Sequence, residues 1–182
     1  YYESEKMSQT KSRKRERVDE RIEFDFGEEA PQEETDKAQF AIVWQGSIDV
    51  RDTGDYEFQI RSPNGVRLYL NLDNMVGRKG LRDDSSDHGQ SALIDGWVGS
   101  GKMREHRARV FLLGGRRYPI RIEFFKYFDK QASIELTWKP PHGVWGPLDE
   151  SNLRTANAPR TFVVETPFPA DDRSFGYERG TS

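Results

Sequence analysis

The residues best suited to metal chemistry lie in one long polar stretch, residues 71–102. Asp83, Asp84 and Asp87 supply the hard carboxylate oxygens that a cation such as calcium prefers. Their spacing does not match a helix-loop-helix calcium loop, because no glutamate closes the loop at the expected place. A solvated acidic loop explains them better, so we treat these aspartates as weak metal candidates only.

A second set of polar side chains flanks a strand expected at 66–70. Asn64, Asn71 and Asp73 offer groups that could hydrogen-bond sugar hydroxyls, and Trp97 offers an aromatic face for a sugar ring. Turn-forming side chains, and an aromatic residue that pins its own loop, explain the same pattern. Both explanations stay open, and these four residues form the candidate ligand-binding site.

The candidates for catalytic residues are weaker than those for ligand binding. The sequence contains no G-x-S-x-G, H-E-x-x-H or phosphate-loop motif. Glu123 and Glu135 could form a carboxylate pair for glycoside hydrolysis, but both alternate with apolar residues and are predicted to be surface cross-strand charges. His88, His106 and His142 fall in different expected elements, whereas a zinc site needs them to converge. We therefore expect that this chain is not an enzyme.

The composition of the chain argues against several further classes of function. The 182 residues fit one domain with tails, and 34% hydrophobic against 32% charged residues indicates a compact middle with solvated ends. Because the chain has no cysteine, disulfides, thiolate metal sites, cysteine nucleophiles and covalent haem attachment are excluded within it. A formal net charge of -3 attracts neither nucleic acid nor an anionic membrane. No apolar run approaches the about 18 residues of a membrane span, so we expect no membrane insertion.

The two ends of the chain differ from its middle. Residues 1–37 are dense in charge and are predicted to form a linker, with a candidate first strand near 22–26 where apolar and charged residues alternate. A basic run at 11–17 could contact nucleic acid, but acidic neighbours offset it and no aromatic residues interleave. Residues 154–182 are rich in proline and are predicted to form a strap and a joint to the next domain.

Residues 38–153 are predicted to form one domain of antiparallel strands. Apolar residues recur at every second position in six segments, which is typical of strands with one buried face. The expected inward residues are Phe40, Ile42, Trp44; Tyr56, Phe58, Ile60; Val66, Leu68, Leu70; Ala108, Val110, Leu112; Tyr118, Ile120, Ile122, Phe124; and Ala132, Ile134, Leu136, Trp138. Turn signals separate these segments and no helical period competes, so an all-β sandwich or barrel is indicated.

Five motifs within this domain occur in a characteristic order. They are Phe40-x-Ile42-x-Trp44-x-Gly46, Gly54-Asp55-Tyr56-x-Phe58, Asn64-Gly65-Val66-Arg67-Leu68-Tyr69-Leu70, Leu113-Gly114-Gly115-x-x-Tyr118-x-Ile120-x-Ile122-Glu123, and Ala132-x-Ile134-x-Leu136-x-Trp138-x-Pro140. Together they resemble the protective-antigen (PA-fourteen) domain of bacterial toxins, glycosidases, flocculins and adhesins. The resemblance implies an antiparallel β-sandwich that binds rather than catalyses.

One departure from the family concerns calcium. In the flocculin-type members of the family that this chain resembles, sugar is bound through calcium, which two adjacent aspartates hold. The resemblance implies that Pro63-Asn64 occupies the corresponding place in this chain. Proline supplies no side-chain ligand and asparagine supplies only a neutral carbonyl, whereas calcium takes six to eight oxygen ligands, as a rough rule. We therefore expect no cofactor in this segment, and calcium binding of that subgroup is expected to be lost.

The residues 166–182 resemble the joint that follows this domain in large planctomycetal cytochrome-type proteins. That resemblance implies an exported, multidomain bacterial parent protein and an extracytoplasmic location, in the periplasm or at the cell surface. Our leading hypothesis is a lectin-like, non-catalytic carbohydrate-binding module whose partner is a polysaccharide or glycan. The alternative is a structural or protein-interaction spacer whose partners are the flanking domains of the parent.

Overall fold

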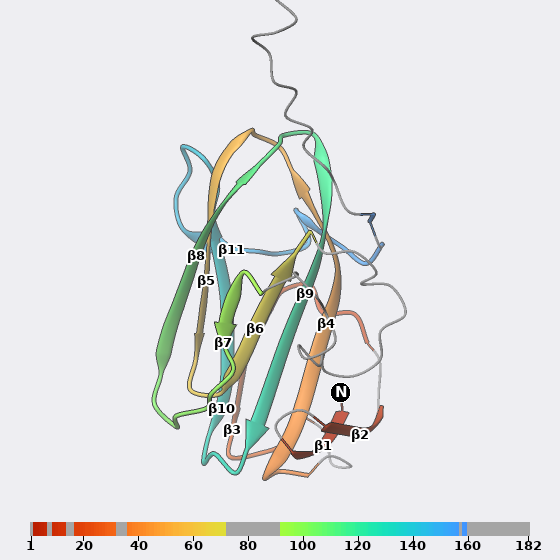
Figure 1. Ribbon diagram of the computed structural model, residues 1–182, viewed down its shortest axis with the longest axis vertical. Coiled ribbons are helices and arrows are strands. Elements are labelled where there is room, and N and C mark those ends of the chain that lie inside the picture. Colours follow the sequence, from red (N-terminus) through yellow and green to blue (C-terminus); the bar gives the residue numbers. More distant parts are fainter. Residues whose placement is uncertain are drawn as a thin grey trace, which may run out of the picture.

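The computed structural model describes residues 2–6, 9–13, 17–31, 36–71, 92–156 and 158–159, the first two ranges by their backbone alone (Figure 1). Within these ranges all the regular secondary structure is β-strand. The strands form two antiparallel sheets that face each other. The prediction of an all-β antiparallel sandwich is confirmed. No helix in these ranges has the length and apolarity needed to cross a bilayer.

The larger sheet has the strand order β2-β1-β4-β9-β6-β7, with β12 also paired to β4. Its strands are β1 (Tyr2–Lys6), β2 (Gln9–Arg13), β4 (Gln39–Val50), β6 (Gly65–Leu70), β7 (Ile94–Gly96), β9 (Arg116–Tyr127) and β12 (Leu153–Arg154). The ladder between β4 and β9 runs over all 12 positions of β4 without a register shift. This long pair forms the centre of the sheet (Figure 1).

The smaller sheet has the order β11-β10-β5-β8, with β3 paired to β10. Its strands are β3 (Glu23–Gly27), β5 (Gly54–Ser62), β8 (Arg104–Leu112), β10 (Ala132–Lys139) and β11 (Gly146–Pro147). In the register of β5 with β10, Gln59 lies opposite Thr137 and Arg61 lies opposite Glu135. All four side chains therefore share one face of this sheet, the face away from the core.

The core between the sheets consists of the residues that the alternation predicted to point inwards, each of them buried or partly buried. Phe58 and Leu68 are fully buried, and Trp138 retains 6% exposure. The sequence pattern missed other members of this core. Ile48 and Val50 continue the alternation of β4 beyond Gly46, whereas Ile94 and Leu148 lie in or next to strands too short to display a period. Trp44 sits at the margin, where its Nε1–H donates to Oδ2 of Asp19 at 2.9 Å.

Three segments differ from the sequence-based expectation. The strands β1 and β2 lie in the segment for which a charged linker was predicted, and Tyr2 and Glu3 pair with Ala41 and Phe40 of β4. The strand near 22–26 exists as β3, so it is the third strand and not the first. The long polar stretch 71–102 contains the short strand β7, which continues the larger sheet beside β6.

A further correction concerns the outer face of β9, which was predicted to carry surface charges. The side chains of Arg121 and Glu123 retain only 2% and 0% exposure, and Nε of Arg121 lies 2.8 Å from Oε1 of Glu123. Phe125 on the same face is also buried. Alternation identified the correct face of the strand, but it does not tell whether that face is covered. Glu135 of β10 does reach solvent, as predicted, and so does Lys139 of the same strand.

Candidate functional site

The turn between β5 and β6 carries Asn64, the first residue of the predicted ligand site. Asn64 is buried, with 1% exposure. Its Nδ2 donates to Oδ2 of Asp129 at 3.0 Å and to the carbonyl of Gln131 at 2.9 Å, and its Oδ1 accepts from the backbone N–H of Ser133 at 3.1 Å. Its own N–H donates to Oγ of Ser62. The side chain thus joins this turn to the turn between β9 and β10.

Oxygens in and beside the same turn accept hydrogen bonds from neighbouring loops. The carbonyl of Pro63 accepts hydrogen bonds from the N–H groups of Ser100 and Gly101, both at 3.2 Å, and the carboxylate of Asp129 accepts from Asn64. These oxygens therefore help to hold the neighbouring loops together. Among the residues that the structure describes, no group of three or more histidine, aspartate or glutamate side chains could hold a metal.

Asn71 lies at the other end of β6 from Asn64. At a rise of about 3.3 Å per residue, the strand separates the two by roughly 20 Å. Asn71 adopts a left-handed conformation with φ of 57°, which asparagine tolerates better than most residues, and its N–H donates to the carbonyl of Pro119 at 2.8 Å. It ends the strand, and the two asparagines do not converge on one ligand.

Trp97 follows β7 and lies at the same end of the sandwich as Asn64, because Gly96 pairs with Val66. Its ring centroid is 4.5 Å from that of Phe125, and the guanidinium carbon of Arg67 lies 4.2 Å from the Trp97 centroid. These are the contacts of an aromatic residue that holds its loop against the sheet. The remaining predicted residues, Asp73, Asp83, Asp84 and Asp87, and also His88, lie outside the described residues.

The two glutamates considered for catalysis lie on opposite sides of the molecule. Glu123 is on the outer face of the larger sheet and Glu135 is on the outer face of the smaller one. Because packed sheets are about 10 Å apart and the two side chains point away from each other, they cannot act as a pair. His106 is half-buried on β8 against Gly96, and burial together with the charge of Arg104 lowers its pKa.

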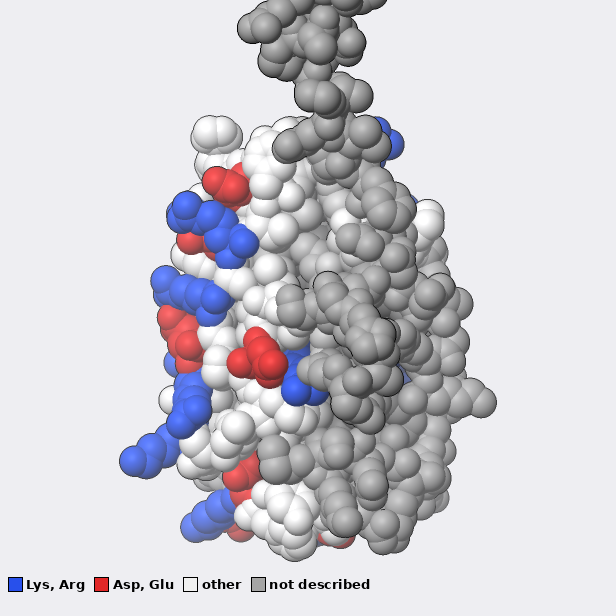
Figure 2. Space-filling model, viewed as in Figure 1, with Lys and Arg blue, Asp and Glu red and all other residues white. Residues whose placement is uncertain are grey.

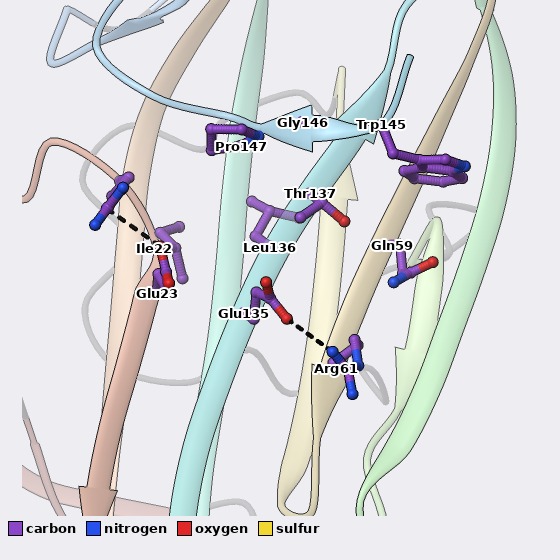
Figure 3. A pocket seen from close by; sticks show the side chains of 11 residues that line it. Ile22, Glu23, Gln59, Arg61, Glu135, Leu136, Thr137, Trp145, Gly146 and Pro147 are labelled. Carbon is purple, nitrogen blue, oxygen red and sulfur yellow. Dashed lines mark hydrogen bonds and ion pairs between the residues drawn. The ribbon is translucent and has the colours of Figure 1, made fainter.

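The described residues form a groove on the outer face of the smaller sheet (Figure 3). It encloses about 420 Å³. Its floor is the pair of strands β5 and β10, one wall is the segment 21–23 that leads into β3, and the other wall is the segment 145–147 that includes β11. Both walls are joined to β10 through the backbone, since Glu23 pairs with Glu135 and the two residues of β11 pair with Thr137 and Trp138.

The floor of the groove carries two cross-strand pairs. Nη1 of Arg61 lies 3.3 Å from Oε2 of Glu135, and both side chains remain about half exposed, at 49% and 40%. The second pair, Gln59 and Thr137, is uncharged. Nε of Arg107 donates to Oε1 of Gln59 at 2.8 Å, which leaves the NH₂ group of Gln59 on the groove side (Figure 3).

The wall of the groove carries an aromatic residue. Trp145 precedes β11 and is partly buried, and the guanidinium carbon of Arg107 lies 5.2 Å from its ring centroid. No local pattern indicates the groove, because its walls come from segments more than a hundred residues apart, at 21–23 and 145–147.

Around the groove the outer face of the smaller sheet carries paired charges. Glu57 lies within 3.5 Å of Nζ of Lys139 and 3.3 Å of Nη2 of Arg109, and the hydrogen bond from Arg109 lowers the pKa of Glu57. Figure 2 shows Lys and Arg side chains alternating with Asp and Glu along the edge of the molecule where Figure 1 places β8. This face is therefore highly polar without a large field of one sign.

The fold and the sequence together define a β-sandwich of the protective-antigen type. The model of the PA14 domain family matches residues 1–144, and the chain belongs to this family. A curated relative, the anti-sigma-I factor RsgI3 of Acetivibrio thermocellus, is 30% identical over 122 residues. The match covers 67% of this chain and 16% of that protein, so the chain spans a small part of the relative's length.

Solved structures share the same fold. An anti-sigma factor domain-containing protein superposes with a TM-score of 0.65 at 24% identity, over 86% of this chain and 47% of that chain. The A domain of epithelial adhesin 6 from Candida glabrata, solved in complex with Galβ1-3GlcNAc, superposes with a TM-score of 0.54 at 16% identity, over 81% of this chain and 72% of that chain. At these identities the likeness concerns the fold.

Proposed function

We propose that this PA14 domain is a non-catalytic carbohydrate-binding module of a larger exported bacterial protein. The observation that carries the proposal is family membership, together with a fold shared with an adhesin domain whose structure contains a bound disaccharide. The polar outer face of the smaller sheet supports it, because neutral glycans are bound by donors and acceptors combined with an aromatic ring.

Binding is proposed to be independent of calcium. The engaged oxygens of Pro63 and Asp129, and the buried amide of Asn64, support this part of the proposal. Without a metal to organise sugar hydroxyls, the affinity should be modest, near millimolar, which corresponds to about 4 kcal/mol. The parent protein is proposed to work outside the cytoplasm, and a planctomycetal cytochrome-type parent stays a prediction from residues 166–182, which lie outside the described residues.

The proposal is tested by screening the 182-residue chain on an array of neutral and acidic glycans, with calcium and with EDTA. We expect retention on at least one neutral glycan, at equal levels in the two buffers. Binding that disappears in EDTA would overturn calcium independence. If no glycan binds in either buffer, the carbohydrate-binding function is wrong.

A structural role between neighbouring domains is the second candidate function. The observation that favours this role is that β1 and β12 both pair with β4. Segments near both ends of the described chain are therefore part of one sheet. Cross-linking of the full parent protein tests this role. Abundant links from β1 or β12 to a neighbouring domain, in a chain that binds no glycan, would favour the spacer.

A further inference from the structure

The groove on the smaller sheet lies away from the loops in which sequence reasoning placed the ligand. Its floor is built on two rigid strands, in the register that sets Gln59 opposite Thr137 and Arg61 opposite Glu135. Alternate residues of a strand are about 6 to 7 Å apart on one face, so the two pairs form two rungs separated by that distance. Strands hold side chains in more constant positions than loops do.

Each rung offers both hydrogen-bond donors and acceptors. The NH₂ group of Gln59 donates, the hydroxyl of Thr137 donates and accepts, the guanidinium of Arg61 donates, and the carboxylate of Glu135 accepts. A sugar hydroxyl also donates and accepts, so a row of hydroxyls matches this surface. The orientation of the Gln59 amide is fixed by the bond from Arg107 to its oxygen, and so its donors are already directed at the groove (Figure 3).

Charge in the groove is balanced. Its lining contains Arg21 and Arg61 against Glu23 and Glu135, and each arginine lies 3.3 Å from one of these glutamates. A strongly anionic or cationic ligand would have to break one of these pairs, whereas a neutral polar ligand need not. Balanced charge therefore favours an uncharged, hydroxyl-rich ligand over a phosphate or an acidic peptide.

The size and the walls of the groove agree with such a ligand. A volume of about 420 Å³ lies within the range of about 300 to 1,000 Å³ for small-molecule sites. Trp145 stands at one end and supplies apolar area against which a ring can pack. The ring is steadied by the guanidinium of Arg107, which lies over it.

We propose that this groove, between segment 21–23 and β11, is the site that binds a neutral saccharide, with Gln59, Arg61, Thr137 and Glu135 as hydrogen-bonding residues and Trp145 as the packing residue. The proposal deepens the carbohydrate-binding function and rests on it. It places the ligand on the outer face of the smaller sheet and not at the end that carries Asn64 and Trp97.

The test is an NMR titration of the 182-residue chain with cellobiose, lactose, maltose and Galβ1-3GlcNAc, since chemical shifts report millimolar binding. We expect one of these sugars to shift the indole N–H of Trp145 and the amides of Gln59 and Thr137. The variant Thr137→Val keeps the shape and removes the hydroxyl, and Trp145→Ala removes the ring. Each should weaken binding by about tenfold, the effect of losing roughly 1.4 kcal/mol.

The matched control is Thr155→Val, which makes the same change at an exposed threonine outside the groove and should leave the affinity unchanged. Because Trp145→Ala could loosen β11, the thermal midpoint of each variant is measured alongside, and Thr137→Val carries the test if that strand is lost. Shifts confined to the groove, with weakened binding in Thr137→Val alone or in both groove variants, support the proposal.

Two outcomes overturn the proposal and differ in what they leave standing. If a sugar binds but its shifts map to Asn64 and Trp97, with groove variants unaffected, the groove is wrong and the carbohydrate-binding function survives. If none of the four sugars shifts any resonance, the groove is wrong as the saccharide site. A negative glycan array in addition would remove the function itself.

Discussion

Nδ2 of Asn64 donates a hydrogen bond to Oδ2 of Asp129 at 3.0 Å, across two turns that are 65 residues apart in the chain. The contact explains why a residue that looked like a ligand donor is inaccessible. With further bonds to the carbonyl of Gln131 and the N–H of Ser133, the amide fixes the end of the sandwich at which β5 turns into β6. The hydrogen bonds of the Asn64 side chain therefore stabilise the fold.

The first prediction follows from this contact. The variant Asn64→Ala removes the hydrogen bonds of a buried amide and leaves partly buried backbone groups of Gln131 and Ser133 without this partner, so it should lower the unfolding free energy by about 2 to 3 kcal/mol. Asn152→Ala is a graded control, because the Asn152 side chain makes one bond to the backbone, from Nδ2 to the carbonyl of Asp49 at 3.0 Å, and otherwise accepts only an exposed bond from Oγ of Ser151 among the contacts of the described residues. Urea unfolding followed by tryptophan fluorescence measures both. A loss for Asn64→Ala no larger than for Asn152→Ala would contradict the structural role.

The second prediction separates two glutamates that look alike in the sequence. Glu123 is buried beside Arg121, and its removal leaves a buried guanidinium without this carboxylate, so Glu123→Ala should cost about 3 to 5 kcal/mol. Glu135 forms a half-exposed pair with Arg61, and Glu135→Ala should cost no more than about 1 kcal/mol. Chemical denaturation of the two variants measures the difference. Equal losses would show that the outer face of β9 is open to water.

The third prediction concerns a close approach between β4 and β12. A Cβ added at Gly46 would lie 2.3 Å from the carbonyl oxygen of Arg154, a backbone atom that cannot rotate away. Gly46→Ala should therefore displace β12 or cost about 1 to 3 kcal/mol. The control is Gly146→Ala, since nothing lies within 4 Å of a Cβ there, and its effect should stay within about 0.5 kcal/mol. Thermal unfolding and hydrogen exchange at Leu153 check both variants.

The fourth prediction concerns pH. Burial lowers the pKa of His106 below its ordinary value of 6.5, with a further contribution from Arg104 that Asp95 opposes. The unfolded chain therefore binds a proton more readily than the folded chain. The stability linked to His106 is present above pH 6.5 and is lost as the pH falls through the lowered pKa. The free energy of unfolding should therefore decrease as the pH is lowered from about 7.5 to about 5.

The matching variants assign that dependence to one residue. His106→Gln should flatten the pH profile measured by urea unfolding, because glutamine does not titrate. His142→Gln changes an exposed histidine and should leave the profile as it is in the unmodified chain. If both variants keep the slope of the unmodified chain, another group causes it.

The fold was largely predictable from the sequence because its signal is local. Alternation along a strand assigns each side chain to a face, and residues from Phe40 to Trp138 occupy the core as expected. Glu123 marks the limit of this reasoning. Whether an outer face is covered depends on segments distant in the chain, which a period of two does not encode. The strand β7 was missed for the related reason that its three residues are too few to display a period.

The candidate site was much less predictable. Asn64, Asn71 and Trp97 were selected because of their residue types, and the structure places Asn71 at the opposite end of β6 from the other two. Trp145 and Gln59 come together only because the two-residue strand β11 and the strand β5 both pair with β10, so no spacing along the chain connects them. Residue type suggests what a side chain can do, while the fold decides which side chains meet.

The pairing of β1 and β12 with β4 also affects how this sandwich behaves beside copies of itself. Because β9 occupies one edge of β4 along its whole length, β1 and β12 must both lie on the other edge, near the start and in the second half of the strand. Apolar, strongly β-forming segments such as Phe40 to Trp44 recruit identical chains when their backbone groups are unpaired. Pairing of β1 and β12 covers that edge at four positions, which discourages aggregation there, and charges on β8, including Arg107 and Arg109, serve the same purpose at an edge of the other sheet.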